Sequence, residues 1–229
     1  MHLPDSFKES DPHLLHSLID THPLGTWVTF VNDEINVNHI PFVLDKEVGE
    51  YGVLRGHINR GNPVCKSLTT GKQSTVIFHG AESYISPSWY ASKKIHEKVV
   101  PTWNYAVVHA HGVAKIIDDK QWLLEQLNTL TDSQEKRLQQ GSIRTIEQPN
   151  DESQSQAKQW KVADAPKSYI ERMMNGIIGI EIPIDKLTGT WKTSQNKQTQ
   201  DKASVIAGLS ALTDSNSAEM ASYIAKHTD

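Results

Sequence analysis

The sequence predicts an α+β protein in which an antiparallel β-barrel carries helices at its periphery. Six or seven short runs rich in β-branched and aromatic residues are separated by turn residues, which is typical of antiparallel strands. Helical segments interrupt these runs at irregular intervals, without the regular strand–helix alternation of a parallel sheet. No repeat of solenoid or propeller period is present. These three observations favour a small closed antiparallel barrel.

The composition indicates a globular protein with a sizeable core. The chain has 229 residues, of which 37% are hydrophobic and 22% are charged. No apolar run reaches the roughly eighteen residues of a membrane span, and the first residues lack the apolar core of a signal peptide, so we expect a cytoplasmic protein without membrane contact. The formal net charge of −4 does not attract nucleic acid, so direct DNA binding is not expected. The single cysteine, Cys65, excludes an internal disulfide and a multi-thiolate metal site.

The first half of the chain is predicted to contain a helix, three strands and a short second helix. Asp11 can accept hydrogen bonds from the free amides of a helix that begins at Pro12. Asn62 and Pro63 provide the same signals for a second helix, which stops before Gly71. Hairpin-length links between the three strands predict an antiparallel meander. The expected ranges are 12–20 and 62–68 for the helices and 25–31, 35–44 and 51–58 for the strands.

The second half continues with four strands and four helices. Asp118, with Gln121 three residues later, predicts the start of a helix that has apolar residues at helical spacing. Residues 132–159 are rich in Gln, Ser, Glu and Asp and are expected to form an exposed or mobile connection. The remaining strands are expected at 73–78, 105–117, 177–184 and 189–196, and the remaining helices at 164–174, 199–210 and 216–226.

An aromatic segment between two predicted strands, residues 78–105, is the first candidate for a binding site. It contains Trp89, Trp103 and three of the chain's six tyrosines among Ser, Pro, His and Lys residues. Long connections tend to be functional lids or binding loops. Aromatic rings beside hydroxyl and amide groups suit a flat, partly polar ligand. The alternative is a loop whose tryptophans cap the edge of a core.

Two basic residues are candidates for binding an anion. Arg60 stands just before the predicted helix start at Asn62, where free backbone amides favour a phosphate. The alternative for Arg60 is an arginine at a hairpin end, paired with a surface carboxylate. Lys192 is followed by Ser194 and Gln195 in a second polar cluster. It can join the same pocket only if the barrel brings the strand ends together.

Other catalytic signatures are weak or missing. His109 and His111 are two residues apart in a predicted strand, so their side chains point to the same face. Two histidine ligands of one metal ion would need this arrangement. No HExxH motif, second cysteine or acidic partner at fixed spacing accompanies them, and we expect no metal site. The sequence contains no GxSxG elbow, P-loop or GxGxxG fingerprint, which disfavours the corresponding hydrolases and the nucleotide-binding folds.

Six phrases occur along the sequence in this order: NHIPFVL (38–44), GHINRGNP (56–63), YISPSWY (84–90), VPTWNY (100–105), GIIGIEIPI (176–184) and KTSQN (192–196). Taken together, these phrases resemble the PaiB family of FMN-binding split-barrel proteins. They span nearly the whole chain, and several together are more specific than any one alone. The resemblance implies a split β-barrel, with residues 1–229 as a single domain that has a C-terminal helical extension. It also implies a homodimer with FMN at the subunit interface, and PaiB is described as a negative transcriptional regulator of protease synthesis and sporulation genes.

The resemblance implies FMN-binding roles for residues in four of these phrases. Arg60 and Lys192 would bind the phosphate, and Trp89 and Trp103 would form walls beside the isoalloxazine ring. Amide and hydroxyl groups would meet the polar edge of the ring. The full set of candidates is Arg60, Asn62, Ser86, Ser88, Trp89, Thr102, Trp103, Asn104, Lys192 and Gln195.

The sequence departs from the family pattern in two places. Residues 138–158 are interpreted as a flexible insertion that leaves a mobile arm or adds to a dimer contact. The segment between the SPSWY and VPTWNY phrases contains Lys93, Lys94 and Lys98, which could serve an anionic partner or form a solvated tip.

Three functions follow from the resemblance and stay open at this point. The first is an FMN-dependent oxidoreductase, in which the flavin carries the electron chemistry and His39, His57 or His79 could supply a proton. The second is a transcriptional regulator or ligand sensor that uses the bound cofactor without turnover. The third is a haem-binding split-barrel protein with a histidine as axial ligand.

Overall fold

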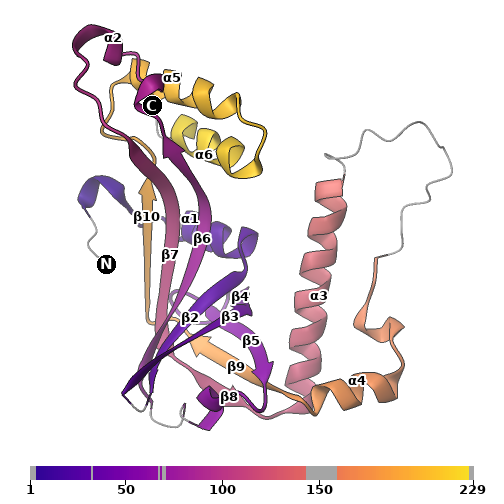
Figure 1. The fold of residues 1–229 in the computed structure, drawn as a ribbon. Helices are drawn as coiled ribbons and strands as arrows, with labels where there is room; N and C mark the ends of the chain where they lie inside the picture. Colours follow the sequence, from indigo (N-terminus) through magenta and orange to yellow (C-terminus); the bar gives the residue numbers. More distant parts are fainter. Residues whose placement is uncertain (1–3, 32, 67, 69–70, 143–158, 227–229) are drawn as a thin grey trace, which may run out of the picture. The chain divides into compact units, whose positions relative to one another are not determined.

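The computed structural model describes residues 4–31, 33–66, 68, 71–142 and 159–226. It divides into two compact units, each built from several stretches of the chain (Figure 1). The first unit contains residues 1–28, 75–111 and 185–229, and the second contains residues 29–74 and 112–184. Among the described residues no helix is both long enough and apolar enough to cross a membrane.

The strands form two antiparallel sheets. The six-stranded sheet has the order β1-β10-β7-β6-β2-β3, and the four-stranded sheet has the order β4-β5-β9-β8. This confirms the predicted α+β class with antiparallel strands. The described strands do not close into one continuous barrel, which corrects the expectation of a closed barrel. The bounds are β1 Lys8–Glu9, β2 Leu24–Val31, β3 Glu34–Pro41, β4 Val43–Asp45, β5 Val53–Asn59, β6 Gln73–Ile85, β7 Thr102–Val113, β8 Lys115–Ile117, β9 Ile177–Pro183 and β10 Lys186–Lys192.

Helix α1 (Pro12–Thr21) covers one face of the first unit's sheet. The Asp11 side chain accepts a hydrogen bond from the His13 amide at 2.9 Å, as the capping signal predicted. The helix buries three apolar side chains, and glycines on the sheet leave room for two of them. A Cβ at Gly80 would lie 2.8 Å from Leu18 Cδ1, and a Cβ at Gly189 would lie 2.2 Å from Leu15 Cδ2. The cap at Asp11 therefore sets where α1 begins, and the close approach of its leucine side chains to Gly80 and Gly189 holds the helix on the sheet.

The end of the first unit is a helical cap on the β6–β7 hairpin. Helices α5 (Thr199–Ser210) and α6 (Ser215–Lys226) occupy nearly the predicted ranges. They enclose an apolar cluster with residues of β6 and of the connection that follows it, and Val205, Leu209, Met220 and Ile224 are completely or almost completely buried. The connection carries the 3₁₀ helix η4 (Pro87–Trp89) and the short helix α2 (Lys93–His96). The hairpin tip is therefore packed against the C-terminal helices.

In the second unit the four-stranded sheet packs against the long helix α3 (Lys120–Ser142). A Cβ at Gly179 of β9 would lie 2.4 Å from the Trp122 ring, so the absence of a side chain there allows the helix to approach the sheet. Helix α4 (Lys167–Met174) precedes β9, and the 3₁₀ helices η2 (Pro63–Lys66) and η5 (Val162–Asp164) lie in the connections. A further 3₁₀ turn, η1 (Asp5–Phe7), belongs to the first unit.

Several predicted boundaries are wrong, each for a local reason. The predicted strand 35–44 is two strands in different sheets, because the chain changes sheet at Phe42. Strand β6 continues to Ile85, so the connection between β6 and β7 is residues 86–101 and not the whole aromatic segment. Helix α3 continues to Ser142, so residues 132–142 are helical, and residues 143–158 of the predicted insertion lie outside the described part. The residue that caps α3 is Asp119, which accepts from the Trp122 amide at 2.7 Å.

Candidate functional site

Eight of the ten predicted flavin-binding residues lie in the first unit, and Arg60 and Asn62 lie in the second. In the first unit they come from the start of β7, the end of β10 and the connection after β6. The register pairs Lys192 of β10 with Tyr105 of β7, which places the end of one strand beside the start of the other. Strand pairing alone therefore brings together two phrases that are about ninety residues apart in the sequence.

Lys192 and Thr102 form the most direct contact in this set. The Lys192 ammonium group donates a hydrogen bond to Thr102 Oγ1 at 2.7 Å, and both side chains are partly buried. Among the described residues no carboxylate lies within ion-pair distance of Lys192. A partly buried cation beside a hydroxyl group, without a neutralising partner, is suited to bind an anion such as a phosphate.

A second contact, below the surface, joins β7 to the turn that follows β10. Asn104 is completely buried, and its Nδ2 donates to Ser194 Oγ at 2.9 Å. Ser194 adopts a left-handed backbone conformation with φ +62°, which turns the chain after β10. Asn104 Oδ1 and Thr193 Oγ1 are buried without a hydrogen-bond partner among the described residues. Buried polar atoms usually have partners, so these two acceptors are unusual features of the site.

Gln195 holds the turn after β10. Its Oε1 accepts from the Thr193 amide at 2.8 Å, and its Nε2 donates to the Trp191 carbonyl oxygen. Both polar ends of the side chain are thus occupied by the turn itself. The contribution of Gln195 that the structure shows is to fix the backbone beside Lys192.

Ser86, Ser88 and Trp89 form a compact turn at the end of β6. Ser86 Oγ accepts from the Ser88 amide at 3.2 Å and lies 2.7 Å from Ser88 Oγ, so Ser86 caps η4. The Trp89 ring packs on α5, because a Cβ at Gly208 would lie only 2.5 Å from it. Ser92 adds two hydrogen bonds to the Asp201 carboxylate, at 2.9 and 2.8 Å. The environment of Trp89 is therefore the core edge that was the alternative for this segment.

Trp103 lies on the exposed face of the sheet. Its side chain is 48% exposed, its Nε1 donates to Glu82 Oε2 at 3.2 Å, and its ring meets that of Tyr84 edge to face with centroids 6.1 Å apart. Glu82 and Tyr84 are not among the predicted site residues, because residues 78–105 are predicted to form a loop. Their spacing of two residues, which is the period of a strand, was the available signal. Two exposed aromatic rings beside a carboxylate form a surface for a flat, partly polar ligand.

Arg60 and Asn62 make defined contacts within the second unit. The Arg60 guanidinium binds both oxygens of Asp118, at 2.8 and 2.7 Å, and donates to the Ile177 carbonyl at 3.1 Å. The hydrogen bonds from Arg60 lower the pKa of the Asp118 carboxyl. Asn62 caps η2 by accepting from the Val64 amide at 3.0 Å and donates to Asn38 at 2.7 Å. Pairing with a surface carboxylate, which was the alternative for Arg60, is thus what the structure shows.

Three histidines belong to the exposed face of the first unit's sheet. The rings of His109 and His111 are 6.2 Å apart, and Thr75 Oγ1 lies 2.9 Å from His111 Nδ1. Burial lowers the pKa of His109 to about 4, and the positive charges of His111 and His79 act in the same direction. Burial also lowers the pKa of His111. Within the described ranges no group of three or more His, Cys, Asp or Glu side chains is arranged to hold a metal ion.

The low pKa of His109 predicts a loss of stability in mild acid. The unfolded chain binds a proton near pH 6.5 and the native imidazole binds one only near pH 4, so the free energy of unfolding should fall as the pH is lowered through this window. After allowance for screening by solvent we expect a loss of about 1–2 kcal/mol. Urea unfolding at several pH values, compared between the native chain and His109→Gln, measures this. Identical pH dependence in both proteins would contradict the prediction.

The two antiparallel sheets and their peripheral helices define an α+β protein of split-barrel architecture. Solved structures with the same fold include a conserved hypothetical protein from Mycobacterium tuberculosis, with a TM-score of 0.55 and 10% identity over 86% of this chain and 94% of that chain. They also include the "FAD and Heme binding protein" from Mycobacterium smegmatis, with a TM-score of 0.52 and 16% identity over 81% of this chain and 73% of that chain. At these identities the likeness shows the fold alone.

Residues 1–186 match the family model described as "Putative FMN-binding domain", and the chain belongs to this family. An uncharacterised protein from Emericella nidulans is 34% identical over 93% of this chain and 91% of its own length. "Protease synthase and sporulation protein PAI 2" from Bacillus subtilis is 28% identical over 96% of this chain and 95% of its own length. These matches confirm the resemblance to the PaiB family that the sequence phrases indicated.

Proposed function

We propose that the protein binds FMN through its first unit and uses the flavin either for electron transfer or for sensing. The observation that carries this proposal is the Lys192–Thr102 pair, a partly buried ammonium group without a carboxylate partner among the described residues. Family membership supports a flavin as the ligand. A flavin supplies the electron chemistry, whereas the protein supplies binding and orientation.

In the proposed site each group has a separate task. Lys192 and Thr102 bind the phosphate, and Trp103 with Tyr84 packs against the flat ring. The Glu82 carboxylate can accept a hydrogen bond from an N–H on the polar edge of the ring. Trp89 supports the site indirectly, because its ring packs on α5 and so holds the β6–β7 hairpin against that helix. Arg60 remains the second phosphate candidate, but it would have to give up its pair with Asp118 to bind one.

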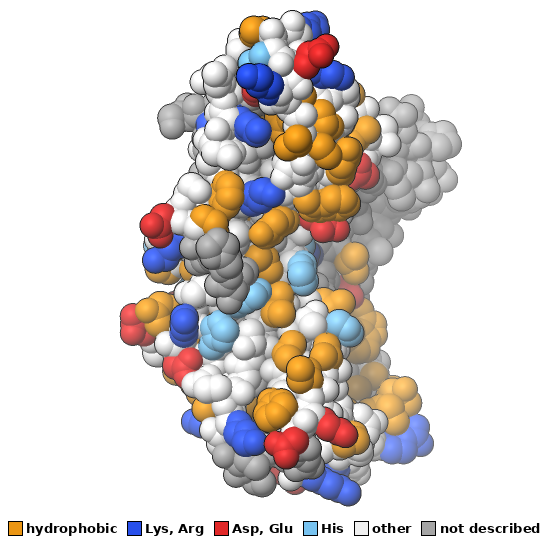
Figure 2. Space-filling model, turned by 60° about the vertical axis from the view of Figure 1, so that its left-hand side comes forward, with side chains coloured by type: hydrophobic (Ala, Val, Ile, Leu, Met, Phe, Trp, Pro, Cys, Tyr) orange, Lys and Arg blue, Asp and Glu red, His pale blue; other side chains and the backbone are white. Residues whose placement is uncertain are grey.

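We further propose a homodimer formed through the exposed face of this sheet. Leu24 of β2 is 61% exposed there, and Tyr84 and Trp103 add two large exposed aromatic side chains. A face on which hydrophobic and histidine side chains lie together is visible in Figure 2. Contiguous exposed apolar surface is typical of interaction sites, and a two-fold axis allows such a face to pair with itself. A flavin held at this face would then contact both copies.

Titration with FMN tests the proposal directly. We expect saturable quenching of tryptophan fluorescence with one FMN per chain at micromolar concentration, and a smaller quench for Trp103→Phe. The flavin-loaded protein should sediment with twice the mass of the 25.7 kDa chain. A Soret band in the purified protein would favour haem instead. A colourless protein that takes up no FMN, yet shifts a DNA fragment in physiological salt, would overturn the proposal.

A further experiment separates turnover from sensing. Anaerobic addition of a reduced nicotinamide to the FMN-loaded protein should bleach the flavin absorbance if the protein is an oxidoreductase. Unchanged absorbance, together with an altered affinity for a partner molecule in the loaded state, would favour the regulator or sensor.

A further inference from the structure

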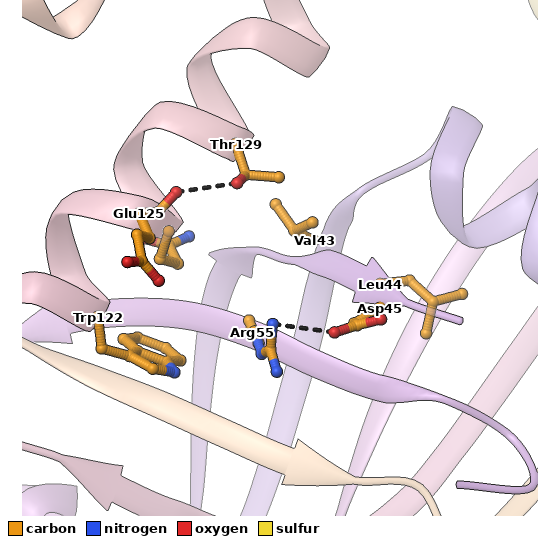
Figure 3. Close-up of a pocket in the computed structure, with 8 residues that line it drawn as sticks. Val43, Leu44, Asp45, Arg55, Trp122, Glu125 and Thr129 are labelled. Carbon is orange, nitrogen blue, oxygen red and sulfur yellow. Dashed lines mark hydrogen bonds and ion pairs between the residues drawn. The ribbon is translucent and has the colours of Figure 1, made fainter. Parts of the chain in front are cut away.

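A cavity in the second unit lies between α3 and the strands β4 and β5 (Figure 3). Its volume is about 390 Å³, within the range of pockets that bind small molecules. None of its lining residues belongs to the ten predicted flavin-binding residues, and the proposed function gives it no role. The residues that line it are Val43, Leu44, Asp45, Arg55, Trp122, Glu125, Gln126 and Thr129.

Two hydrogen-bond donors at the cavity, one from β5 and one from α3, lack acceptors among the described residues. Arg55 forms an ion pair between its Nη1 and Asp45 at 2.9 Å and donates a hydrogen bond from Nε to Glu181 at 3.2 Å, whereas its Nη2 makes no hydrogen bond with the described residues. Gln126 is only 4% exposed, and its Oε1 is 2.8 Å from His57 Nδ1. Its Nε2 is buried without a partner among the described residues. A buried donor of this kind is a costly exception unless a ligand or water supplies an acceptor oxygen.

The cavity also contains groups that suit a cation. The Trp122 ring and the Glu125 carboxylate both come from α3 and lie on the same side of the cavity in Figure 3. Glu125 accepts a side-chain hydrogen bond from Gln121 at 2.9 Å. An aromatic face beside a carboxylate attracts an ammonium group through cation–π and Coulomb interactions.

The balance of charge excludes a simple anion as the ligand. Arg55 contributes one positive charge, whereas Asp45, Glu125 and Glu181 contribute three negative charges, so the group carries a net charge of −2. A carboxylate without a compensating cation would therefore be repelled. A molecule that carries an ammonium group of its own satisfies the carboxylate of the cavity, and its oxygen atoms can accept hydrogen bonds from the two donors.

We propose that this cavity binds a free α-amino acid. The ammonium group lies against Trp122 and Glu125, and the carboxylate oxygens accept hydrogen bonds from Arg55 Nη2 and Gln126 Nε2. The side chain of the amino acid contacts Val43 and Leu44, which provide the apolar part of the lining. This assignment would make the second unit a ligand-binding module that is chemically independent of the flavin.

Binding is tested on the full-length protein with each of the twenty common L-amino acids at 10 mM. We expect at least one to raise the Tm and to change the tryptophan fluorescence, with a smaller fluorescence change in Trp122→Phe. The matching amine without the carboxylate, and the matching acid without the amine, should each bind at least about tenfold more weakly. If no amino acid has an effect, or if the amine binds as tightly as the amino acid, the proposal is overturned.

Two variants assign the ligand to the cavity. Glu125→Gln should weaken amino-acid binding about tenfold, because it removes the charge that faces the ammonium group. Glu171→Gln is the matched control, since Glu171 is an exposed residue of α4 that does not line the cavity. FMN binding should be unchanged in both variants, so failure here and failure of the proposed flavin site are distinguishable. Equal weakening in the two variants would place the ligand elsewhere.

Discussion

Replacing Lys192 by methionine is expected to weaken FMN binding about 10- to 100-fold, while riboflavin binding stays within about twofold. The methionine side chain fills nearly the same space as the aliphatic part of lysine but carries no charge. In the native chain the Lys192 ammonium group is partly buried and already oriented by Thr102 at 2.7 Å, so no large rearrangement is needed before a phosphate binds. Loss of a charge-assisted hydrogen bond to the phosphate therefore appears in FMN affinity and not in riboflavin affinity.

Fluorescence titrations with FMN and with riboflavin measure this difference. Lys186→Met is the matched control, because Lys186 lies at the other end of the same strand and is exposed. Arg60→Ala tests the second phosphate candidate in the same assay. If Lys192→Met weakens both flavins equally, Lys192 acts on the fold or on the ring and the phosphate has been placed wrongly. A loss of FMN affinity in Arg60→Ala alone would move the phosphate to the second unit.

The sequence predicted the parts of the fold that depend on local signals. Helix α1 begins where Asp11 and Pro12 indicated, and α5 and α6 nearly match their expected ranges. Prediction failed where the signal was ambiguous or non-local. Asp118 and Asp119 are both good caps, and the bidentate contact that commits Asp118 to Arg60 joins residues far apart in the sequence. No local pattern distinguishes the two residues.

The candidate site was predicted in composition but not in arrangement. The Lys192–Thr102 contact depends on the register of β10 with β7, which single-sequence patterns do not fix. Trp89 and Trp103 look equivalent as aromatic residues in neighbouring phrases, yet one packs on Gly208 and the other is exposed. The two tryptophans differ because Trp89 packs on α5, a helix that lies more than one hundred residues after Trp89 in the sequence. Residue type therefore identified candidates, and tertiary packing decides which of them can meet a ligand.

The cavity in the second unit was missed for a related reason. Its lining residues come from β4, β5 and α3, and on the sequence Trp122 counts only as part of a helical apolar stripe. The Gln126 Nε2 atom, which has no hydrogen-bond partner among the described residues, can be recognised only after every nearby acceptor has been placed. Sites built from unsatisfied atoms leave no sequence motif, because the lack of a hydrogen-bond partner is a property of the folded chain alone.

Replacing Gly112 by alanine is expected to lower the free energy of unfolding by about 3 kcal/mol or more. Gly112 is buried in β7, and a Cβ there would lie 2.1 Å from the Pro183 carbonyl oxygen and 2.9 Å from Ile182 Cγ2. The first of these atoms belongs to the backbone of β9 and has no rotamer by which to move away. The Gly112 carbonyl is also held, since it accepts from Ser74 Oγ at 2.9 Å. The strand must therefore shift to make room.

Gly176→Ala is the matched control for this substitution in urea unfolding. At Gly176 the nearest atom to an added Cβ is the Met173 carbonyl oxygen at 3.4 Å, which is ordinary van der Waals contact. The reduced freedom of the unfolded chain should make this variant neutral or more stable by up to about 1 kcal/mol. The difference in free energy of unfolding between Gly112→Ala and Gly176→Ala therefore separates the effect of the close backbone approach at Gly112 from the general effect of adding a methyl group. If the two variants differ by less than about 0.5 kcal/mol, the close approach of β7 to Pro183 does not exist in solution.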